Sequence, residues 1–342
     1  MTIYIICPKL SGRGGIETVL TTVIKRLSEN KINVVLYIQN HPQHTKWIDG
    51  LKNNNVRVIY GNKFSHLLIV TYLFISAGRE SRFLIASTSR ISLLGFFIKK
   101  MLGKKWLLFH WLHFSLNISH NYNYLNKCDG ILAISSSIAQ QLSHFNIDRR
   151  KIYLIYNPCV IDQGSNLITS DKQKRFTYIG RLEDKQKNVS ELLRALSLIN
   201  NKNMILDIYG DGKDKGKYKA LSQKLKIDNI VIWHGWKDSI WKTIKNKPNA
   251  LILPSRFEGF PMILLEAMSR GIPCITSDFL GYKDIIVERR NGVHYHLGHP
   301  EELAEILDRF DDISFSSQVI KDSIVKFNQE EYFKRLNKAI QI

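Results

Sequence analysis

The sequence ALILPSRFEGFPMILLEAMSRGIPCIT, residues 250–276, contains two short apolar runs separated by a loop and a helix-length segment. The runs 250–253 and 273–276 suit buried strands, because they are brief, apolar and partly β-branched. Residues 262–268 are apolar all round except for Glu266, which predicts a buried helix. Pro261 suits the first position of that helix, where no amide hydrogen is needed. The stretch therefore predicts a strand, a helix and a second, parallel strand.

The same alternation extends outward through all 342 residues, and this length suits two domains. We expect an α/β protein with two Rossmann-like, doubly wound parallel-sheet domains. The expected domains are 1–165 and 166–322, joined through a polar linker at 161–175 and followed by a helical tail at 323–342. Further strands are expected at 2–7, 33–38, 56–59, 83–86, 106–110, 131–134, 152–156, 176–179, 204–209 and 230–233.

Positive charge is concentrated in the first half of the chain. Lys and Arg number 49 against 30 Asp and Glu, and residues 1–170 hold 20 of the former against 7 of the latter. Such a basic half suits an anionic partner, either phosphate-rich lipid or nucleic acid. A basic nucleic-acid-binding protein is the non-enzymatic alternative, but no helix-turn-helix, zinc-finger or aromatic RNA-binding signature accompanies the charge. We therefore expect no nucleic-acid partner.

Residues 91–109 interleave large apolar side chains with Lys99, Lys100, Lys104 and Lys105. The pattern suits contact with anionic lipid headgroups, although a core helix followed by a lysine-rich turn fits equally well. The longest apolar stretch, 67–77, is too short to span a bilayer, and no signal peptide or disulfide framework is evident. We expect a cytoplasmic protein, with peripheral contact at the inner face of the cytoplasmic membrane.

Two carboxylates are placed where an open α/β sheet binds ligands. Glu258 follows the strand 250–253, and Glu266 lies on the helix that comes next. Burying a carboxylate on a helix costs free energy unless it is paired or accepts hydrogen bonds. Carboxylate oxygens accept hydrogen bonds from hydroxyls, so Glu258 and Glu266 could hold separate hydroxyl pairs of one ligand. The alternative is that Glu266 only caps the helix or pairs with a neighbour.

Cations and glycines follow two other strands. Gly180 and Arg181 end the strand 176–179, and Lys187 comes shortly after, with Lys185 as a competitor. Such a cation pair can neutralise a diphosphate leaving group without metal, and the chain contains no D-x-D motif. Gly14 and Gly15 stand between a strand and a helix, where the backbone can approach a diphosphate. Their spacing is not G-x-G-x-x-G, and Gln39 replaces the acidic residue of an NAD site.

Glu258 and Glu266 form an E-x7-E pair, and FEGFPMILLEAMSRGIPCI resembles the retaining glycosyltransferases of family 4. The resemblance implies the GT-B fold, two Rossmann-like domains facing a cleft, with the acceptor held by the first domain and the sugar nucleotide by the second. It implies that Glu258 binds the donor sugar and Glu266 the ribose, with no metal or other cofactor. Its other implied site residues are Arg181, Lys187 and Gly180 at the diphosphate, Phe260, Pro261 and Met262 near sugar or phosphate, Gly14 and Gly15 at the phosphates, His113 at the sugar, and Gly235 and Trp236 near the base.

The resemblance extends over most of the chain, through SGRGGIETV, WLHFSL, LAISSSI, WHGW and RFEGFPM. It implies transfer of a hexose, galactose by likeness, from a UDP-sugar to a lipopolysaccharide core or similar glycolipid acceptor. Related enzymes that use UDP-glucose, UDP-N-acetylhexosamine or a GDP-sugar on another surface polysaccharide are the alternative. His110, in the same run as His113, is expected to be structural.

Overall fold

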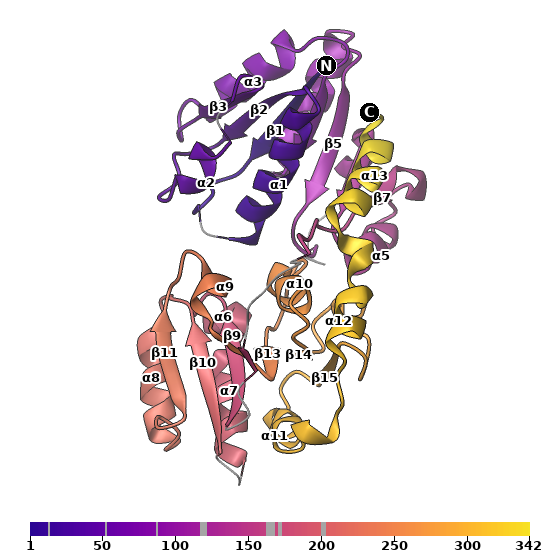
Figure 1. Cartoon of the computed structure of the whole chain (residues 1–342). Helices are drawn as coiled ribbons and strands as arrows, with labels where there is room; N and C mark the ends of the chain where they lie inside the picture. The colour runs from indigo at the N-terminus through magenta and orange to yellow at the C-terminus, as the bar shows by residue number, and fades with distance from the viewer. Residues whose placement is uncertain are drawn as a thin grey trace. The chain divides into compact units, whose positions relative to one another are not determined.

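Two parallel β-sheets organise the chain in the computed structural model, which describes residues 1–12, 14–51, 53–86, 88–116, 122–161, 168–169, 173–199 and 203–342. The chain divides into two units (Figure 1). The first unit contains residues 1–158 and 329–342, and the second contains 159–328. The predicted fold class, two doubly wound α/β domains, is confirmed.

The first unit is built on a seven-stranded sheet of order β3-β2-β1-β4-β5-β6-β7. All of its neighbouring strands pair in parallel. The order reverses between β1 and β4, so the loops after these two strands meet at the switch point where such sheets bind ligands. The strands are β1 Thr2–Cys7, β2 Asn33–Ile38, β3 Val56–Tyr60, β4 Arg82–Ile85, β5 Leu107–Leu112, β6 Gly130–Ala133 and β7 Ile152–Leu154.

Helices follow these strands and bury apolar faces against the sheet. The core beneath α3 and α4 is aromatic: Phe74 stacks on Trp106 with ring centroids 5.4 Å apart, and both rings also contact Phe83. The helices of the first unit are α1 Gly15–Glu29, α2 Lys46–Asp49, α3 His66–Ser76, α4 Ser89–Met101, α5 Ser136–His144 and α13 Gln329–Ile340, with 3₁₀ turns at Asn123–Lys127 and Arg149–Lys151.

The last helix, α13, packs beside β6 and β7 of the first sheet (Figure 1). Its amphipathic pattern buries Tyr332 and Leu336. Two long-range hydrogen bonds fix it: Arg335 Nε donates to the Ile155 carbonyl at 3.2 Å, and Arg82 Nε donates to the Ile340 carbonyl at 2.8 Å. The segment expected as a separate tail therefore divides, because residues 323–328 stay with the second unit and α13 completes the first.

The second unit contains a six-stranded parallel sheet of order β11-β10-β9-β13-β14-β15. Its order reverses between β9 and β13, so the loops after these strands lie at its switch point. The strands are β9 Lys174–Ile179, β10 Met204–Tyr209, β11 Val231–Gly235, β13 Ala250–Leu253, β14 Cys274–Ser277 and β15 Gly292–Tyr295, and a separate parallel pair joins β8 Ile168–Thr169 to β12 Asn246–Lys247.

Among the helices of this unit, α7 packs against both α8 and α11 over a large apolar core. The short α10 is buried against β13 and β14, as its apolar sequence predicts. These helices are α6 Asp184–Lys187, α7 Val189–Leu198, α8 Lys215–Lys224, α9 Ile240–Thr243, α10 Met262–Met268, α11 Pro300–Asp308 and α12 Ser317–Ser323, with 3₁₀ turns at Tyr282–Asp284, Phe310–Asp312 and Val325–Phe327.

Two local details differ from what the sequence predicts, and most of the expected linker lies outside the described residues. Pro261 is not the first residue of α10 but its N-cap, because its ψ of 99° is extended rather than helical. The chain passes between units after Pro158, a few residues before the expected boundary, and most of the expected linker, 162–167 and 170–172, lies outside the described residues. In the described part of the chain, no helix is both long and apolar enough to cross a membrane.

Candidate active site

Loops from β9 and β13 are tied together at the switch point of the second unit. The Arg256 amide donates to the Gln186 carbonyl at 2.8 Å, and the Gln186 side-chain amide donates to the Phe257 carbonyl at 3.3 Å. The Arg256 guanidinium also donates to Asn188 Oδ1 at 2.5 Å. Asn188 adopts a left-handed conformation, with φ of 51°, at the end of α6. These contacts fix the predicted carboxylate and cation loops against each other.

The centre of this corner is an ion pair between Glu258 and Lys187. Lys187 Nζ lies 2.5 Å from Glu258 Oε1, and Ser255 Oγ donates to the same oxygen at 2.6 Å. Glu258 is buried, with 8 % of its surface exposed, and Ser255 is fully buried. A charge-assisted bond at this depth holds the carboxylate in one orientation. Lys187, and not the exposed Lys185, is the lysine of this loop that reaches Glu258.

Arg181 and Gly180 stand beside this pair on the loop after β9. The Arg181 guanidinium is 55 % exposed and lies 3.7 Å from Glu183. Its backbone is held more firmly, because the Tyr178 hydroxyl donates to the Arg181 carbonyl at 2.8 Å. Gly180 is packed closely against Gly210, where a Cβ would lie 1.8 Å from the Gly180 carbonyl oxygen. The loop is therefore fixed in its backbone while the arginine side chain faces solvent.

Glu266 has a polar environment that the sequence did not reveal. Its Oε2 accepts a hydrogen bond from the Trp241 indole at 2.8 Å, and the Arg270 guanidinium lies 4.6 Å from the centre of the Trp241 ring. Burial raises the pKa of Glu266, and the bond from Trp241 and the charge of Arg270 lower it in part. Trp241 and Arg270 are therefore candidate site residues that we did not predict, and only the tertiary fold brings Trp241 to α10.

His234 and Gly235 are the last two residues of β11, and Trp236 follows directly. His234 Nε2 lies 2.6 Å from Asp207 Oδ1, and its ring stacks on Tyr209 with centroids 4.2 Å apart. Gly235 has φ of +71° with open space where a side chain would stand, and Trp236 is 38 % exposed. The Gly235 carbonyl accepts the Gly210 amide at 3.0 Å, which joins the end of β11 to the neighbouring loop. The predicted base-binding residues, Gly235 and Trp236, thus lie at the accessible end of β11.

Phe260, Pro261 and Met262 are all buried at the start of α10. The Phe260 ring packs edge-on against Phe327, with centroids 5.2 Å apart. Because these side chains are buried, any contact of the segment with a ligand would be made by its backbone, and its role near the sugar or phosphate stays a prediction.

In the first unit, Gly14 is the N-cap of α1 and Gly15 its first residue. Sequence reasoning missed Glu17, which is hydrogen-bonded to this loop. The buried Glu17 carboxylate accepts hydrogen bonds from the Gly12 amide at 2.7 Å and from the Ser11 hydroxyl at 3.3 Å. A Cβ on Gly14 would lie 2.8 Å from Glu17 Oε2. An acidic residue three positions after an N-cap is the sequence signal that could have identified Glu17.

His110 and His113 are both buried at the end of β5. His110 Nδ1 lies 2.7 Å from Ser92 Oγ, which suits the structural role expected for it. His113 Nε2 has no hydrogen-bond partner among the described residues. Burial lowers the pKa of His110 to about 4 and, together with the nearby His110, lowers that of His113 to about 3. Both imidazoles are therefore neutral near physiological pH.

Both halves of the chain match glycosyltransferase family models. Residues 13–163 match the model described as Glycosyltransferase Family 4, and residues 164–318 match Glycosyl transferases group 1. The lipopolysaccharide 1,6-galactosyltransferase of Escherichia coli K12 is 32 % identical, over 99 % of this chain and 98 % of that protein. The chain belongs to glycosyltransferase family 4. The corresponding protein of Salmonella typhimurium LT2 is 34 % identical, with the same shares covered.

A solved structure of a family 4 relative supports the same assignment. The lipopolysaccharide outer core galactosyltransferase WaaB, in its apo form, is 33 % identical. It superimposes with a TM-score of 0.85 and covers 100 % of this chain and 99 % of that one. The GT-B fold and the hexosyltransferase class of this family 4 enzyme are thus shown, whereas the roles of the individual site residues remain predictions.

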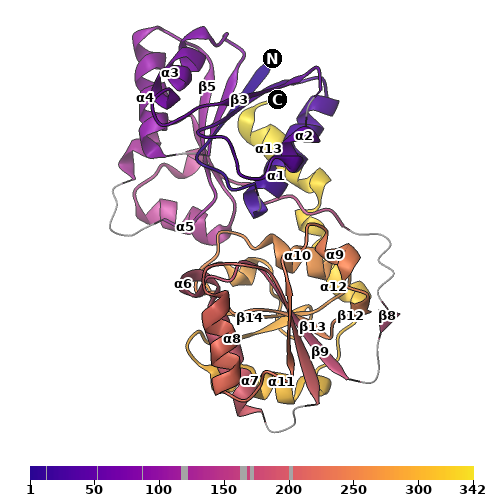
Figure 2. The same cartoon turned by 90° about the vertical axis from the view of Figure 1, so that its left-hand side faces the viewer.

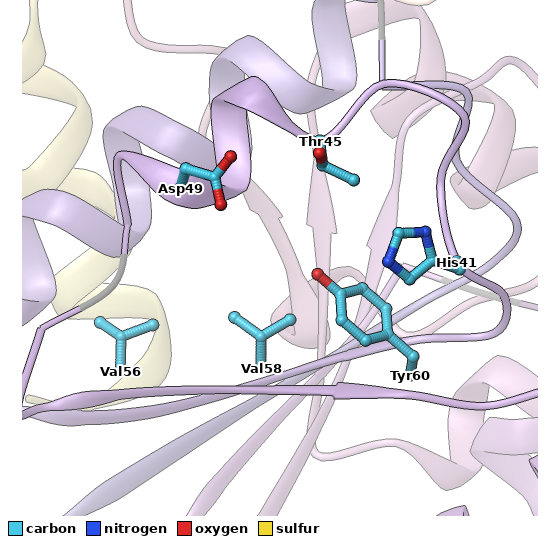
Figure 3. Close-up of a pocket in the computed structure, with 6 residues that line it drawn as sticks. All are labelled: His41, Thr45, Asp49, Val56, Val58 and Tyr60. Atoms are coloured by element: carbon cyan, nitrogen blue, oxygen red, sulfur yellow. The ribbon is translucent and has the colours of Figure 1, made fainter.

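Two further observations concern a metal ion and a pocket elsewhere in this family 4 enzyme. No group of three or more His, Cys, Asp or Glu side chains among the described residues is arranged to hold a metal ion. A pocket in the first unit lies between α2 and the edge strand β3 (Figure 3). None of the predicted site residues lines it; its walls are His41, Thr45, Asp49, Val56, Val58 and Tyr60.

Proposed function

We propose that the chain is a retaining hexosyltransferase that moves galactose from UDP-galactose to a lipopolysaccharide core. The likeness to two lipopolysaccharide 1,6-galactosyltransferases over 99 % of the chain supports both the donor and the acceptor. The observation that carries the site is the Glu258–Lys187 pair, because it lies at the switch point of the second unit.

In this proposal, Glu258 accepts hydrogen bonds from hydroxyls of the donor sugar, and Glu266 accepts them from the ribose. Lys187 lies beside Glu258, so its ammonium can orient the carboxylate and also contact the diphosphate. The exposed Arg181 supplies a second cation at the same loop. Two cations directed at the departing diphosphate stabilise the charge that develops there, which is why we propose that no metal is required.

The first unit would bind the acceptor in this scheme. Gly14 and Gly15 would approach the phosphates through their backbone, and His113 would contact the sugar as a neutral imidazole. No side chain is assigned as a nucleophile: the donor phosphate would assist deprotonation of the acceptor hydroxyl.

We further propose that the protein acts in the cytoplasm, in peripheral contact with an anionic membrane. The basic first half supports this contact, since residues 1–170 carry 20 Lys and Arg against 7 Asp and Glu. Of the lysines in 91–109, Lys99 pairs with Asp129 at 2.6 Å, while Lys100 and Lys105 are exposed. The exposed pair is therefore available to lipid headgroups.

The test is transfer by the purified protein to a core glycolipid that lacks the added hexose. UDP-galactose, UDP-glucose, UDP-N-acetylhexosamine and a GDP-sugar are supplied in turn, with and without a chelator. We expect one hexose to be added from UDP-galactose alone, with an α linkage by NMR and the same rate with chelator. Preference for another donor would favour the alternative family 4 enzymes. Salt-sensitive binding to nucleic acid without UDP affinity would contradict the proposal altogether.

A further inference from the structure

Helix α3 is apolar on two opposite faces. One face is buried in the core of the first unit through Val70, Leu73 and Phe74. The helix carries only three polar side chains among its eleven residues, HLLIVTYLFIS. A helix that is apolar all round is normally enclosed on all sides. The second face of α3 therefore needs an explanation.

That second face forms what we call the α3 stripe, residues Phe64, Leu67, Leu68, Tyr72 and Ile75. Their exposed fractions are 89, 57, 74, 67 and 46 %. The spacing of Leu67, Leu68, Tyr72 and Ile75 places these four along one side of the helix, and Phe64 lies in the turn just before it. A contiguous row of large exposed apolar side chains marks an interaction site more often than a solvated surface.

Hydrogen bonds hold both ends of the segment that carries the α3 stripe. Asn62 Oδ1 accepts the amides of Phe64 and Ser65, each at 2.8 Å, and so holds the turn that begins α3. At the other end, Lys104 Nζ donates to the Ile75 carbonyl at 2.5 Å. The neighbouring helix α4 packs against α3 (Figure 2). Met101, the last residue of α4, is 80 % exposed.

The segment that carries the stripe is rich in cations and almost without acidic side chains. Residues 60–106 contain eight Lys and Arg and a single acidic residue, Glu80. Lys63 precedes Phe64 directly, and Lys100 precedes Met101. Lys63, Lys100 and Lys105 are all exposed and have no ion pair recorded among the described residues. The chemistry of this surface is a row of apolar side chains flanked by positive charge.

We propose that the α3 stripe inserts into the headgroup region of an anionic lipid bilayer, with Lys63, Lys100 and Lys105 contacting the phosphates. The inference extends the membrane contact proposed above from the lysines of 91–109 to a specific helix, and vesicle binding tests it without donor or acceptor. A helix face is convex and offers no groove to a peptide, whereas a bilayer accepts apolar side chains of any arrangement. A second copy docked on the same face would bring these lysines against their own equivalents.

The experiment measures binding of the full chain to vesicles of phosphatidylcholine, with and without phosphatidylglycerol, at low and high salt. We expect binding to the anionic vesicles that weakens as salt rises, because exposed charges are screened. The double variant Leu68→Ser and Tyr72→Ser should lower the partition coefficient by roughly tenfold or more, since both side chains would leave water on insertion. Its melting temperature and UDP affinity should not change.

A control is Leu198→Ser with Leu280→Ser in the second unit, because both leucines are also more than half exposed, by 54 and 52 %. This control should bind vesicles like the wild type. Equal binding by the stripe variant and the wild type would overturn the proposal, as would failure of the wild type to bind anionic vesicles. A dimer of the wild type in solution that the stripe variant dissociates would assign the face to a second copy instead. None of these outcomes depends on whether galactose is transferred.

Discussion

At the scale of single residues, Glu266 shows how burial and hydrogen bonding compete. Its carboxylate lies on the otherwise apolar α10, where burial alone raises its pKa. The Trp241 indole opposes that rise by donating to Oε2 at 2.8 Å, and the Arg270 guanidinium lies 4.6 Å from the centre of the same ring. We infer that Trp241 is a positioning residue for Glu266.

The variant Trp241→Phe keeps an aromatic ring for Arg270 but removes the indole donor. The pKa of Glu266 should rise further, so the carboxylate should become protonated at a higher pH. We expect UDP affinity to fall by about tenfold, and the loss of affinity on the acid side to move to higher pH. Calorimetry with UDP over a pH series measures both effects.

The control is Trp47→Phe, because the Trp47 indole has no hydrogen-bond partner among the described residues. It should leave the UDP titration unchanged. An unshifted acid limb in Trp241→Phe would show that the indole only fills space.

His110 gives a pH dependence of stability with a definite sign. Its pKa is 6.5 in an unfolded chain and about 4 when buried, so the unfolded state binds the proton first as pH falls. Folding stability from this group is present above pH 6.5 and is lost between about pH 6.5 and about pH 4. Over the first 1.5 units or so, the loss should be about 2 kcal/mol.

The test compares urea unfolding near neutral pH and near pH 5 for the wild type and His110→Asn. The amide of Asn can still bond Ser92 but does not titrate, so this variant should lose less stability on acidification. The exposed His144→Gln should behave like the wild type, because His144 is not buried. Parallel pH profiles for His110→Asn and the wild type would contradict the assignment.

At the scale of elements, close backbone contacts join the carboxyl ends of β9, β10 and β11. Gly210 has φ of +151°, and a Cβ there would lie 1.8 Å from the Gly180 carbonyl oxygen. The Gly210 amide donates a hydrogen bond to the Gly235 carbonyl at 3.0 Å. Gly210 therefore sets the spacing between two loops that carry predicted site residues.

Gly210→Ala should lower the free energy of unfolding by about 2–4 kcal/mol, through strain at positive φ and the forced separation of the loops. UDP affinity should fall with it. Gly216→Ala is the matched control: Gly216 lies in α8 with open space where a Cβ would stand, so alanine should stabilise by about 0.5–1 kcal/mol. Chemical denaturation of both variants measures the two changes. A free energy of unfolding for Gly210→Ala equal to that of the wild type would refute the close contact.

The elements that could be predicted from the sequence are those whose signal is local. The run MILDIY became β10 and ALIL became β13 over the expected residues, because short apolar runs have few alternatives. The strand β15 was not predicted, since GVHY begins with glycine and carries the polar His294. The pairing of Trp241 with Glu266 depends on tertiary contact across 25 positions, for which no local pattern exists.

At the scale of the whole molecule, the order of strands explains where the site residues gather. In each sheet the first strand lies in the middle, and later strands are added first on one side of it and then on the other. The change of side falls between β1 and β4 in the first sheet and between β9 and β13 in the second. The Gly14 loop follows the first of these strands, and the Glu258 and Lys187 loops follow the last two. Sequence alternation predicted two such sheets, but the return of α13 to the first unit was not predictable, because its helical period does not specify a partner.

The central claim is that the corner formed by Glu258 and Lys187 holds the donor sugar. The most direct measurement is the turnover of UDP-galactose on core glycolipid by Glu258→Gln, which preserves shape and removes charge. We expect a loss of at least about a hundredfold with an unchanged melting temperature. Glu305→Gln, on the exposed face of α11, should keep full activity. Turnover of Glu258→Gln near the wild-type rate would contradict the account.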